Sequence, residues 1–321
     1  YLKLGIRNNS DWQKSTDALL SSLPHKNLYN SSEIPWTEIV TSQPEGFVVK
    51  EDGNVNITSG KGLAWLISTV NGLNGQDANS YEGLVISLEN DIDISGNMWV
   101  AIGTQENPFR GTFDGQGFSI NGIYMYDAWE GRNFGLFGVL DNAVIKSVVL
   151  GEGQIVGYED CGGIAFLADN DTHIDGCIIG AKISFYNYGG GVVGTNRDSR
   201  ISNCGVIPIT VGVDGNYNGG IAGQNISVNA DAIIENCYAV SLFGASYSSY
   251  YPGGIVGKNL TENEGHKAIV RNCYAAPLSL YGVFCGGIAG YNSKNSLIEN
   301  SYTNYSSDYE ICGENHGDVV N

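Results

Sequence analysis

The densest cluster of side chains that could do chemistry is acidic: Asp169, Asp171 and Asp175 lie close together in the chain. Carboxylates at alternating positions are typical of a calcium loop, which also needs a bidentate glutamate at its twelfth position. Counted from Asp171, that position is Lys182. We therefore interpret the segment as an acidic, solvated loop and expect no bound cofactor, with a calcium ion as the alternative.

A second set of candidates is aromatic and recurs along the chain. Its members lie three residues before a repeated glycine or in the same segments: Tyr188, Tyr217, Tyr250, Tyr251, Tyr281 and Phe284. Their ring faces could pack on the C–H faces of sugars, and Tyr beside Asn and Ser is also typical of antibody paratopes. The alternative is a structural stack that covers one corner of the fold. The sequence leaves both open, because it does not show where each ring points.

The cysteines are a third set, and four of them share one repeat position: Cys177, Cys204, Cys237 and Cys273. Their spacing matches no zinc motif. A repeated small residue in an interior column favours core packing, because a free thiol behaves as a small hydrophobic group. Cys285 and Cys312 lie about one repeat apart, so a disulfide between them is an alternative to two free thiols.

No catalytic motif accompanies these residues. The four histidines are His25, His173, His266 and His316, and none belongs to the His-Glu-x-x-His pattern of a zinc peptidase. No column repeats Asp, Lys or Arg in neighbouring copies, as the cleft of a polysaccharide lyase would. We expect a protein that is not an enzyme. The alternative is a carbohydrate-active enzyme, a lyase or glycoside hydrolase, that uses paired carboxylates.

Charge and composition narrow the class of protein. The chain has 34 acidic and 16 basic residues, a net charge of −18, which argues against binding to nucleic acid or to anionic lipid. No apolar run is long enough to span a membrane. The chain begins at Tyr1. We therefore expect a removed leader, or a lipidated N-terminus that anchors the protein at an outer membrane.

The elements that must position these residues follow from an internal repeat. Gly accounts for 45 of 321 residues and Pro for 7, which favours short strands and tight turns. Six segments of the form GIxG or close to it are spaced by 28, 28, 29, 34 and 33 residues: they begin at Gly135, Gly163, Gly191, Gly220, Gly254 and Gly287. A second Gly directly precedes the last five, and a block close to IxNC follows each segment. Paired glycines forbid long helices, and the unit is too short for a propeller blade. The repeat predicts an all-β, right-handed parallel β-helix of about eight coils.

Equivalent residues of such coils stack about 4.8 Å apart, so like side chains form ladders. Stacked amides can hydrogen-bond along the first asparagine column: Asn196, Asn225, Asn259 and Asn292. A second column is made of Asn203, Asn236, Asn272 and Asn300.

Apolar residues at i, i+3, i+4 and i+7 predict an N-terminal capping helix over residues 61–71, which Thr58 or Ser59 begins and Gly72 ends. We divide the chain into an N-terminal extension, 1–57, and a β-helix, 58–321, with regular coils over 134–302. Residues 1–45 do not fit the repeat, and we interpret them as a linker, an extra cap or the remnant of another domain.

Residues 58–302 resemble the GLUG-motif family, whose Gly-Leu-x-Gly core is Gly135–Gly138 here. The upstream segments GLAWLISTVN, LENDIDISGNMWVAIGT and FRGTFDGQG also look like the start of that family's domain. The resemblance implies a right-handed parallel β-helix in a secreted or outer-surface bacterial protein, and many members are described as adhesins. The motif also occurs in the non-catalytic part of IgA-cleaving metallopeptidases. The family supplies no catalytic residues to carry over.

Together these points predict an extracellular or cell-surface bacterial protein that binds a ligand without catalysis. From the resemblance and the tyrosines we expect the partner to be a host glycan or glycoprotein, and the protein to be a monomer. A structural stalk that holds another domain away from the cell is a further alternative.

Overall fold

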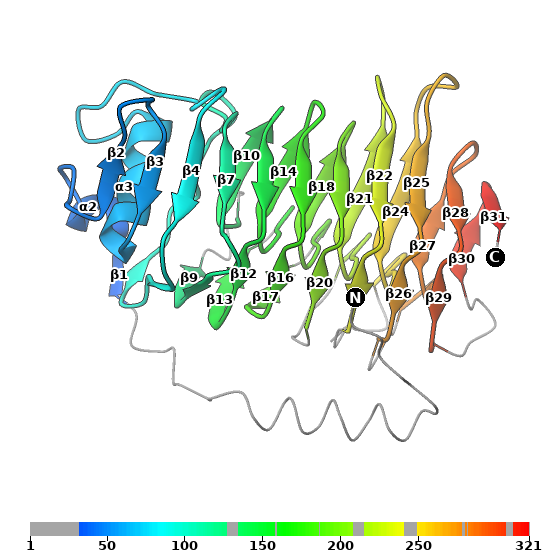
Figure 1. The fold of residues 1–321 in the computed structure, drawn as a ribbon. Helices are drawn as coiled ribbons and strands as arrows, with labels where there is room; N and C mark the ends of the chain where they lie inside the picture. The colour runs from blue at the N-terminus through cyan, green and yellow to red at the C-terminus, as the bar shows by residue number, and fades with distance from the viewer. Residues whose placement is uncertain are drawn as a thin grey trace. The chain divides into compact units, whose positions relative to one another are not determined.

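The computed structural model describes residues 32–126, 134–157, 159–185, 187–207, 215–240, 249–277, 280, 282–305 and 311–320. The chain separates into two compact units, Tyr1–Asn30 and Ser31–Asn321, and all the described residues belong to the second. In that unit, strands of successive coils pair in parallel and form a β-solenoid of about eight turns (Figure 1). The predicted all-β parallel solenoid is confirmed.

The largest sheet has eleven strands, and all of its pairs are parallel except the first. Its order is β2 (Phe47–Val49), β3 (Val55–Ile57), β4 (Val85–Leu88), β7 (Thr112–Asp114), β11 (Val144–Lys146), β15 (His173–Asp175), β19 (Arg200–Ser202), β22 (Ala232–Glu235), β25 (Ala268–Arg271), β28 (Leu297–Glu299) and β31 (Asp318–Val320). The middle residues of its strands are fully buried and form one column of the core: Ile145, Ile174, Ile201, Ile234, Val270 and Ile298. Burial of each such side chain contributes about 1.5–3 kcal/mol.

Two further sheets form the other sides of the coils. The seven-stranded sheet runs β10 (Phe137–Asp141), β14 (Ala165–Asp169), β18 (Val193–Arg197), β21 (Ala222–Ser227), β24 (Val256–Thr261), β27 (Ala289–Asn292) and β30 (Cys312–Asn315). The eight-stranded sheet contains β5 (Ile92–Asp93), β8 (Ser119–Asn121), β12 (Val149–Leu150), β16 (Ile178–Ile179), β20 (Gly205–Val206), β23 (Tyr238–Ala239), β26 (Tyr274–Ala275) and β29 (Tyr302–Thr303).

Smaller sheets pair β9 (Ile123–Tyr126), β13 (Gly153–Val156) and β17 (Lys182–Ser184), and β1 (Ser32–Pro35) with β6 (Asn97–Met98).

The N-terminal end of the solenoid is covered by helix α3 (Gly60–Asn71), which follows the short helix α2 (Trp36–Ile39) (Figure 1). The Oγ of Ser59 accepts a hydrogen bond from the Gly62 N–H at 3.1 Å, and Gly72 ends the helix with φ 72°. The expected capping helix is therefore present. Part of the predicted N-terminal extension joins the largest sheet, because β2 pairs with β3 and β3 pairs with β4.

The glycines of the repeat allow neighbouring coils to approach where no Cβ would fit. A Cβ on Gly223 would lie 2.1 Å from the carbonyl oxygen of Tyr188 in the preceding coil. A Cβ on Gly191 would lie 2.4 Å from the carbonyl oxygen of Gly220 in the next coil. The repeated glycines are therefore required by contacts between backbones.

The first asparagine column is a continuous, buried hydrogen-bonded ladder. Each Nδ2 donates to the Oδ1 of the next asparagine, at 2.7 Å from Asn196 to Asn225, 2.8 Å to Asn259 and 2.9 Å to Asn292. Asn315 extends the ladder by one more bond of 2.8 Å, which the sequence did not lead us to expect. The same amides donate to turn carbonyls, as Asn259 does to Ala268, so the ladder also holds the turns in place.

Asparagine recurs in the second column for a different reason. Its members have φ between 45° and 54° and exposed side chains: Asn203, Asn236, Asn272 and Asn300. Asn tolerates this left-handed conformation better than other residues with a side chain. These asparagines therefore recur because the backbone at this corner adopts a conformation that Asn tolerates.

The four cysteines of the shared column, Cys177, Cys204, Cys237 and Cys273, are buried free thiols. Burial raises the pKa of Cys237 well above its ordinary value. This is the expected core packing, and it makes the Cys237 thiol a poor nucleophile.

The alternative of a Cys285–Cys312 disulfide is wrong, because both residues are free thiols. Cys312 pairs in register with Ala289, so the two cysteines occupy different positions of their coils. Burial raises the pKa of Cys285 to about 11 and that of Cys312 to about 12.

We predict that Gly223→Ala lowers the free energy of unfolding by at least about 2 kcal/mol, because its Cβ would overlap the Tyr188 carbonyl. Gly265→Ala is the matched control, since a Cβ there meets nothing within 4 Å. Chemical denaturation followed by circular dichroism measures both. Equal midpoints for the two variants would contradict the role given to the repeated glycines.

We also predict that Asn259→Ala costs about 2–4 kcal/mol, because it leaves the Asn292 and Ala268 oxygens without their donor in the core. Asn315→Ala, at the exposed end of the ladder, should cost less than about 1 kcal/mol. The same denaturation measurement tests the pair. A similar loss in both variants would show that position along the ladder does not matter.

Candidate functional site

Four aromatic residues form one continuous stack of rings, with one ring for each coil. The ring centroids of Tyr188 and Tyr217 are 5.7 Å apart, those of Tyr217 and Tyr251 5.0 Å, and those of Tyr251 and Phe284 5.3 Å. The planes differ by only 6°, 6° and 13°. We call these four residues the aromatic ladder.

All four ladder residues adopt the left-handed backbone conformation, with φ of 53°, 58°, 61° and 58°. Bulky residues rarely adopt it, because their Cβ crowds the backbone. Contacts between stacked rings offset part of this cost, since an aromatic pair contributes about 0.5–1.5 kcal/mol. The ladder therefore has a structural role at one corner of the solenoid.

The stacking changes how a ligand can meet the tyrosines. Each inner ring is covered on both faces by its neighbours, so the expected packing of sugar C–H faces on these ring faces does not fit the structure. The partly exposed rings of the ladder present their edges instead. Among the aromatic residues that the sequence suggested for ligand binding, the most exposed described side chains are Tyr250 at 46% and Phe284 at 37%. Tyr281 lies outside the described residues.

A column of partly exposed side chains runs beside the ladder on the seven-stranded sheet. Its members are in register from coil to coil, and each directly precedes an asparagine of the buried ladder: Thr195, Gln224, Lys258, Tyr291 and Glu314. We call this column and the aromatic ladder together the aromatic strip. This column does not stand out in the sequence, because its residue types differ. Their constant place before a repeated Asn was the signal that could have revealed it.

Side chains of the column contact the rings. The Lys258 Nζ lies 5.3 Å from the centroid of the Tyr217 ring, which is a cation–π distance. Tyr291 meets Tyr251 edge-on, with centroids 5.7 Å apart and planes at 81°. The strip is therefore a preformed surface whose side chains already hold one another in place.

The C-terminal end of the strip is a small hydrogen-bonded network. The Tyr251 hydroxyl donates to Glu314 Oε2 at 2.9 Å, and His316 Nε2 lies 2.8 Å from Glu314 Oε1. The hydrogen bond to Glu314 raises the pKa of Tyr251 to about 12. The bonds from His316 and Tyr251 lower the pKa of Glu314 in turn.

Asp160 stands at the N-terminal end of the strip, at the ladder position of the preceding coil. It shares the left-handed conformation, with φ 43°, but carries a carboxyl in place of a ring. Burial raises the pKa of Asp160 to about 6, and the Thr195 hydroxyl donates only a long bond of 3.4 Å. The Asp160 carboxyl is therefore suited to gain or lose a proton near neutral pH.

The acidic cluster predicted from the sequence is not brought together. Asp169 belongs to β14 and pairs with Arg197, whose Nε donates to Oδ1 at 2.8 Å. Asp175 belongs to β15 and accepts bonds of 2.6 Å from Ser202 and from Asn203. Partial burial raises the pKa of Asp175, but those two hydrogen bonds outweigh it and lower the pKa.

Asp171 lies in the turn between the two strands, with φ 63°. Within the described ranges no three His, Cys, Asp or Glu side chains converge in a way that could hold a metal ion.

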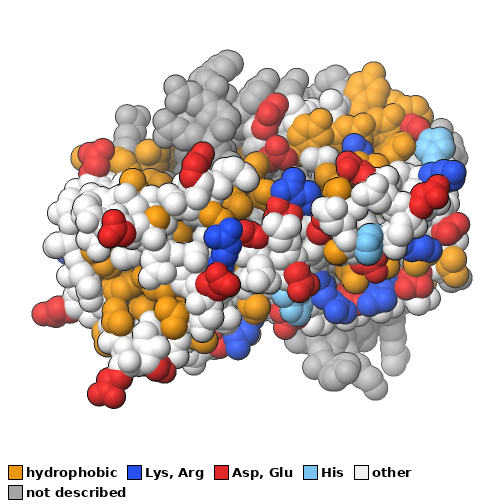
Figure 2. Space-filling view, turned by 90° about the horizontal axis from the view of Figure 1, so that it is seen from above, with side chains coloured by type: hydrophobic (Ala, Val, Ile, Leu, Met, Phe, Trp, Pro, Cys, Tyr) orange, Lys and Arg blue, Asp and Glu red, His pale blue; other side chains and the backbone are white. Residues whose placement is uncertain are grey.

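Other carboxylates are also engaged by basic partners. Glu235 is held between Arg200 and Arg271, and the Arg271 Nε lies 2.7 Å from its Oε2. Burial raises the pKa of Glu235, but the contacts with the two arginines outweigh this effect and lower it. Asp141 pairs with Arg110, and Lys146 Nζ lies 3.1 Å from Asp114. Figure 2 shows basic and acidic side chains interspersed over the visible face rather than separated into patches. These pairs stabilise adjacent coils and leave the paired carboxylates poorly placed for acid–base chemistry.

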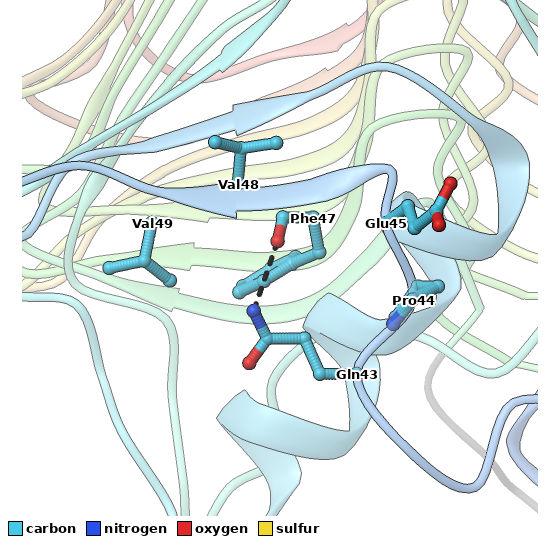
Figure 3. A pocket seen from close by; sticks show the side chains of 6 residues that line it. All are labelled: Gln43, Pro44, Glu45, Phe47, Val48 and Val49. Atoms are coloured by element: carbon cyan, nitrogen blue, oxygen red, sulfur yellow. Dashed lines mark hydrogen bonds between the residues drawn. The ribbon is translucent and has the colours of Figure 1, made fainter.

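One pocket lies at the other end of the largest sheet, beside its first strand, β2 (Figure 3). It is an open hollow lined by Gln43, Pro44, Glu45, Phe47, Val48 and Val49. The Gln43 Nε2 donates to the Phe47 carbonyl oxygen at 3.1 Å and so covers part of this strand edge. Glu45 is the single ionisable side chain among the residues that line this pocket, and one such group does not make a catalytic set.

The fold has a solved counterpart. It is similar to the crystal structure of a "putative immunoglobulin A1 protease" from Bacteroides ovatus, with a TM-score of 0.54, 19% identity, and coverage of 85% of each chain. At this identity the likeness concerns the fold alone. No family model and no curated protein matches the chain, so the resemblance to the GLUG-motif family stays a prediction. None of the described helices has the length and apolar character needed to cross a membrane.

We predict that Asp160→Asn stabilises the protein at pH 7.5 by about 1–2 kcal/mol, since the buried carboxylate is then no longer ionised. The pKa in the folded protein, about 6, is above the ordinary value of 3.8. The wild type therefore loses stability as the pH rises through this window, and the advantage of the variant should shrink toward pH 4. Denaturation at both pH values, with the exposed Asp77→Asn as control, measures this. A constant difference would show that the left-handed backbone, and not the charge, is responsible.

Proposed function

We propose that this chain is the glycan-binding part of an exported bacterial adhesin, and that it binds host glycan or glycoprotein through the aromatic strip without catalysis. The observation that supports the proposal is the strip itself. It combines a rigid row of four aromatic edges, three of them from tyrosines, with a row of polar side chains on neighbouring coils. Tyrosine hydroxyls both donate and accept hydrogen bonds, as sugar hydroxyls do.

Rigidity also supports binding at this surface. Because stacking already holds the rings, they lose little conformational freedom when a ligand arrives. In the part of the chain that the structure describes, no hydrogen bond occupies the hydroxyl groups of Tyr188 and Tyr217. Sugar hydroxyls could therefore bind them without displacing a hydrogen bond between described residues.

A carbohydrate-active enzyme is the second candidate, and Asp160 is the observation that favours it. A general acid needs a raised pKa, and burial raises that of Asp160 to about 6. Such an enzyme also needs a second carboxylate across the scissile bond. In the described residues Asp114, Asp141, Asp169 and Glu235 are engaged by Lys or Arg, so the proposal of a non-catalytic protein is preferred.

The experiment is a binding screen of the purified chain on a broad array of glycans and glycoproteins, in calcium and then in EDTA, with bound sugars checked for cleavage. We expect binding without cleavage. Cleavage that Asp160→Asn abolishes would establish the enzyme instead. A blank array with folded protein would overturn the proposal in favour of a stalk.

The variant that tests the site is the double substitution Tyr188→Phe with Tyr217→Phe. It keeps the stack and removes both hydroxyls, so we expect affinity to fall at least about tenfold, the loss of roughly 1.4 kcal/mol in hydrogen bonding. Tyr238→Phe is the matched control, because Tyr238 lies on the eight-stranded sheet. Unchanged affinity in the double variant would remove the strip from the proposal.

A further inference from the structure

The strip is periodic in one direction only. Its rings are separated by 5.0 to 5.7 Å along the solenoid, and the polar column follows the same repeat. This spacing is close to the length that one pyranose unit adds to an extended glycan chain. A glycan lying along the solenoid would therefore meet one ring edge and one column side chain at each sugar.

Adjacent coils offer complementary partners to such a chain. Lys258 contacts the Tyr217 ring directly. Gln224 is in register with Lys258, and its neighbour Gly223 approaches Tyr188 as Gly257 approaches Tyr217, so Gln224 occupies the same place beside Tyr188. Each pair supplies a hydroxyl that donates or accepts and a side chain that donates. A globular or highly branched ligand would use this repetition at only one or two coils.

The charges of the chain and of the strip argue against an anionic glycan. The chain has a net charge of −18, which repels polyanions at a distance. In the strip, Lys258 and Glu314 carry opposite charges, and Arg197 on the neighbouring edge is already paired with Asp169. The strip therefore offers no positive surface to a sulfated or uronic acid chain.

We propose that the aromatic strip binds a linear, uncharged glycan that runs along the solenoid axis with one sugar per coil. This proposal rests on the proposed function and specifies its ligand. The ladder has four rings, so the contact extends over about four consecutive sugars. Because each of these coils adds one ring edge and one column side chain, affinity should grow with chain length up to that number and then level off.

Isothermal titration calorimetry of the whole chain tests the length dependence. The probes are linear oligosaccharides of one to eight sugars: β-1,4-linked glucose, β-1,4-linked N-acetylglucosamine, and N-acetyllactosamine repeats. For at least one series we expect affinity to rise at least tenfold between two and four sugars and to change less than twofold beyond four. Equal affinity for a monosaccharide and its hexamer would overturn the axial arrangement while leaving the proposed function in place.

Two further arms complete the experiment. Gln224→Ala should weaken binding of the hexamer at least fivefold, whereas Gln154→Ala on β13, in a different sheet, should leave it unchanged. Heparin and hyaluronan oligomers test the charge, and tighter binding of either would overturn the choice of an uncharged ligand. If the array and all these probes show no binding, the proposed function fails together with this inference.

Discussion

Successive coils of this protein approach each other at the spacing of paired β-strands, and the rest of the structure depends on that contact. At one corner the approach is so close that a Cβ on Gly257 would lie 2.0 Å from the Tyr217 carbonyl carbon. In the core, the same spacing brings each asparagine amide within reach of the next. Like residues recur because each coil provides the same surroundings for the same position.

The aromatic strip is a product of the same constraint. Coils in register place a residue at a left-handed corner in five successive turns, from Asp160 to Phe284, and four of these corners carry aromatic rings. Part of the strain of that conformation is offset by stacking, and the stacking turns the ring edges outward. One geometry therefore stabilises the corner and creates a regular surface beside the column that contains Lys258 and Tyr291.

Several carboxylates of this acidic chain have a structural role. Asp169 and Glu235 are held by arginines of neighbouring coils, and Asp175 by Ser202 and Asn203. Carboxylates held in this way link the coils across their edges. The fold shared with a protein described as a protease supplies no chemistry of its own, because function resides in the sites that a fold carries.

The sequence by itself determined the solenoid, because a repeat with paired glycines and recurrent Asn and Cys columns has few other solutions. It also determined the capping helix, through Ser59, Gly72 and the apolar spacing between them. It could not show that Cys312 would pair beside Ala289, since register near the last coil depends on strand pairing. Tertiary structure alone decided that the ladder rings cover one another's faces and that Asp169 and Asp175 diverge. Ring orientation and carboxylate pairing depend on neighbours about thirty residues away, and those contacts exist only once the coils are stacked.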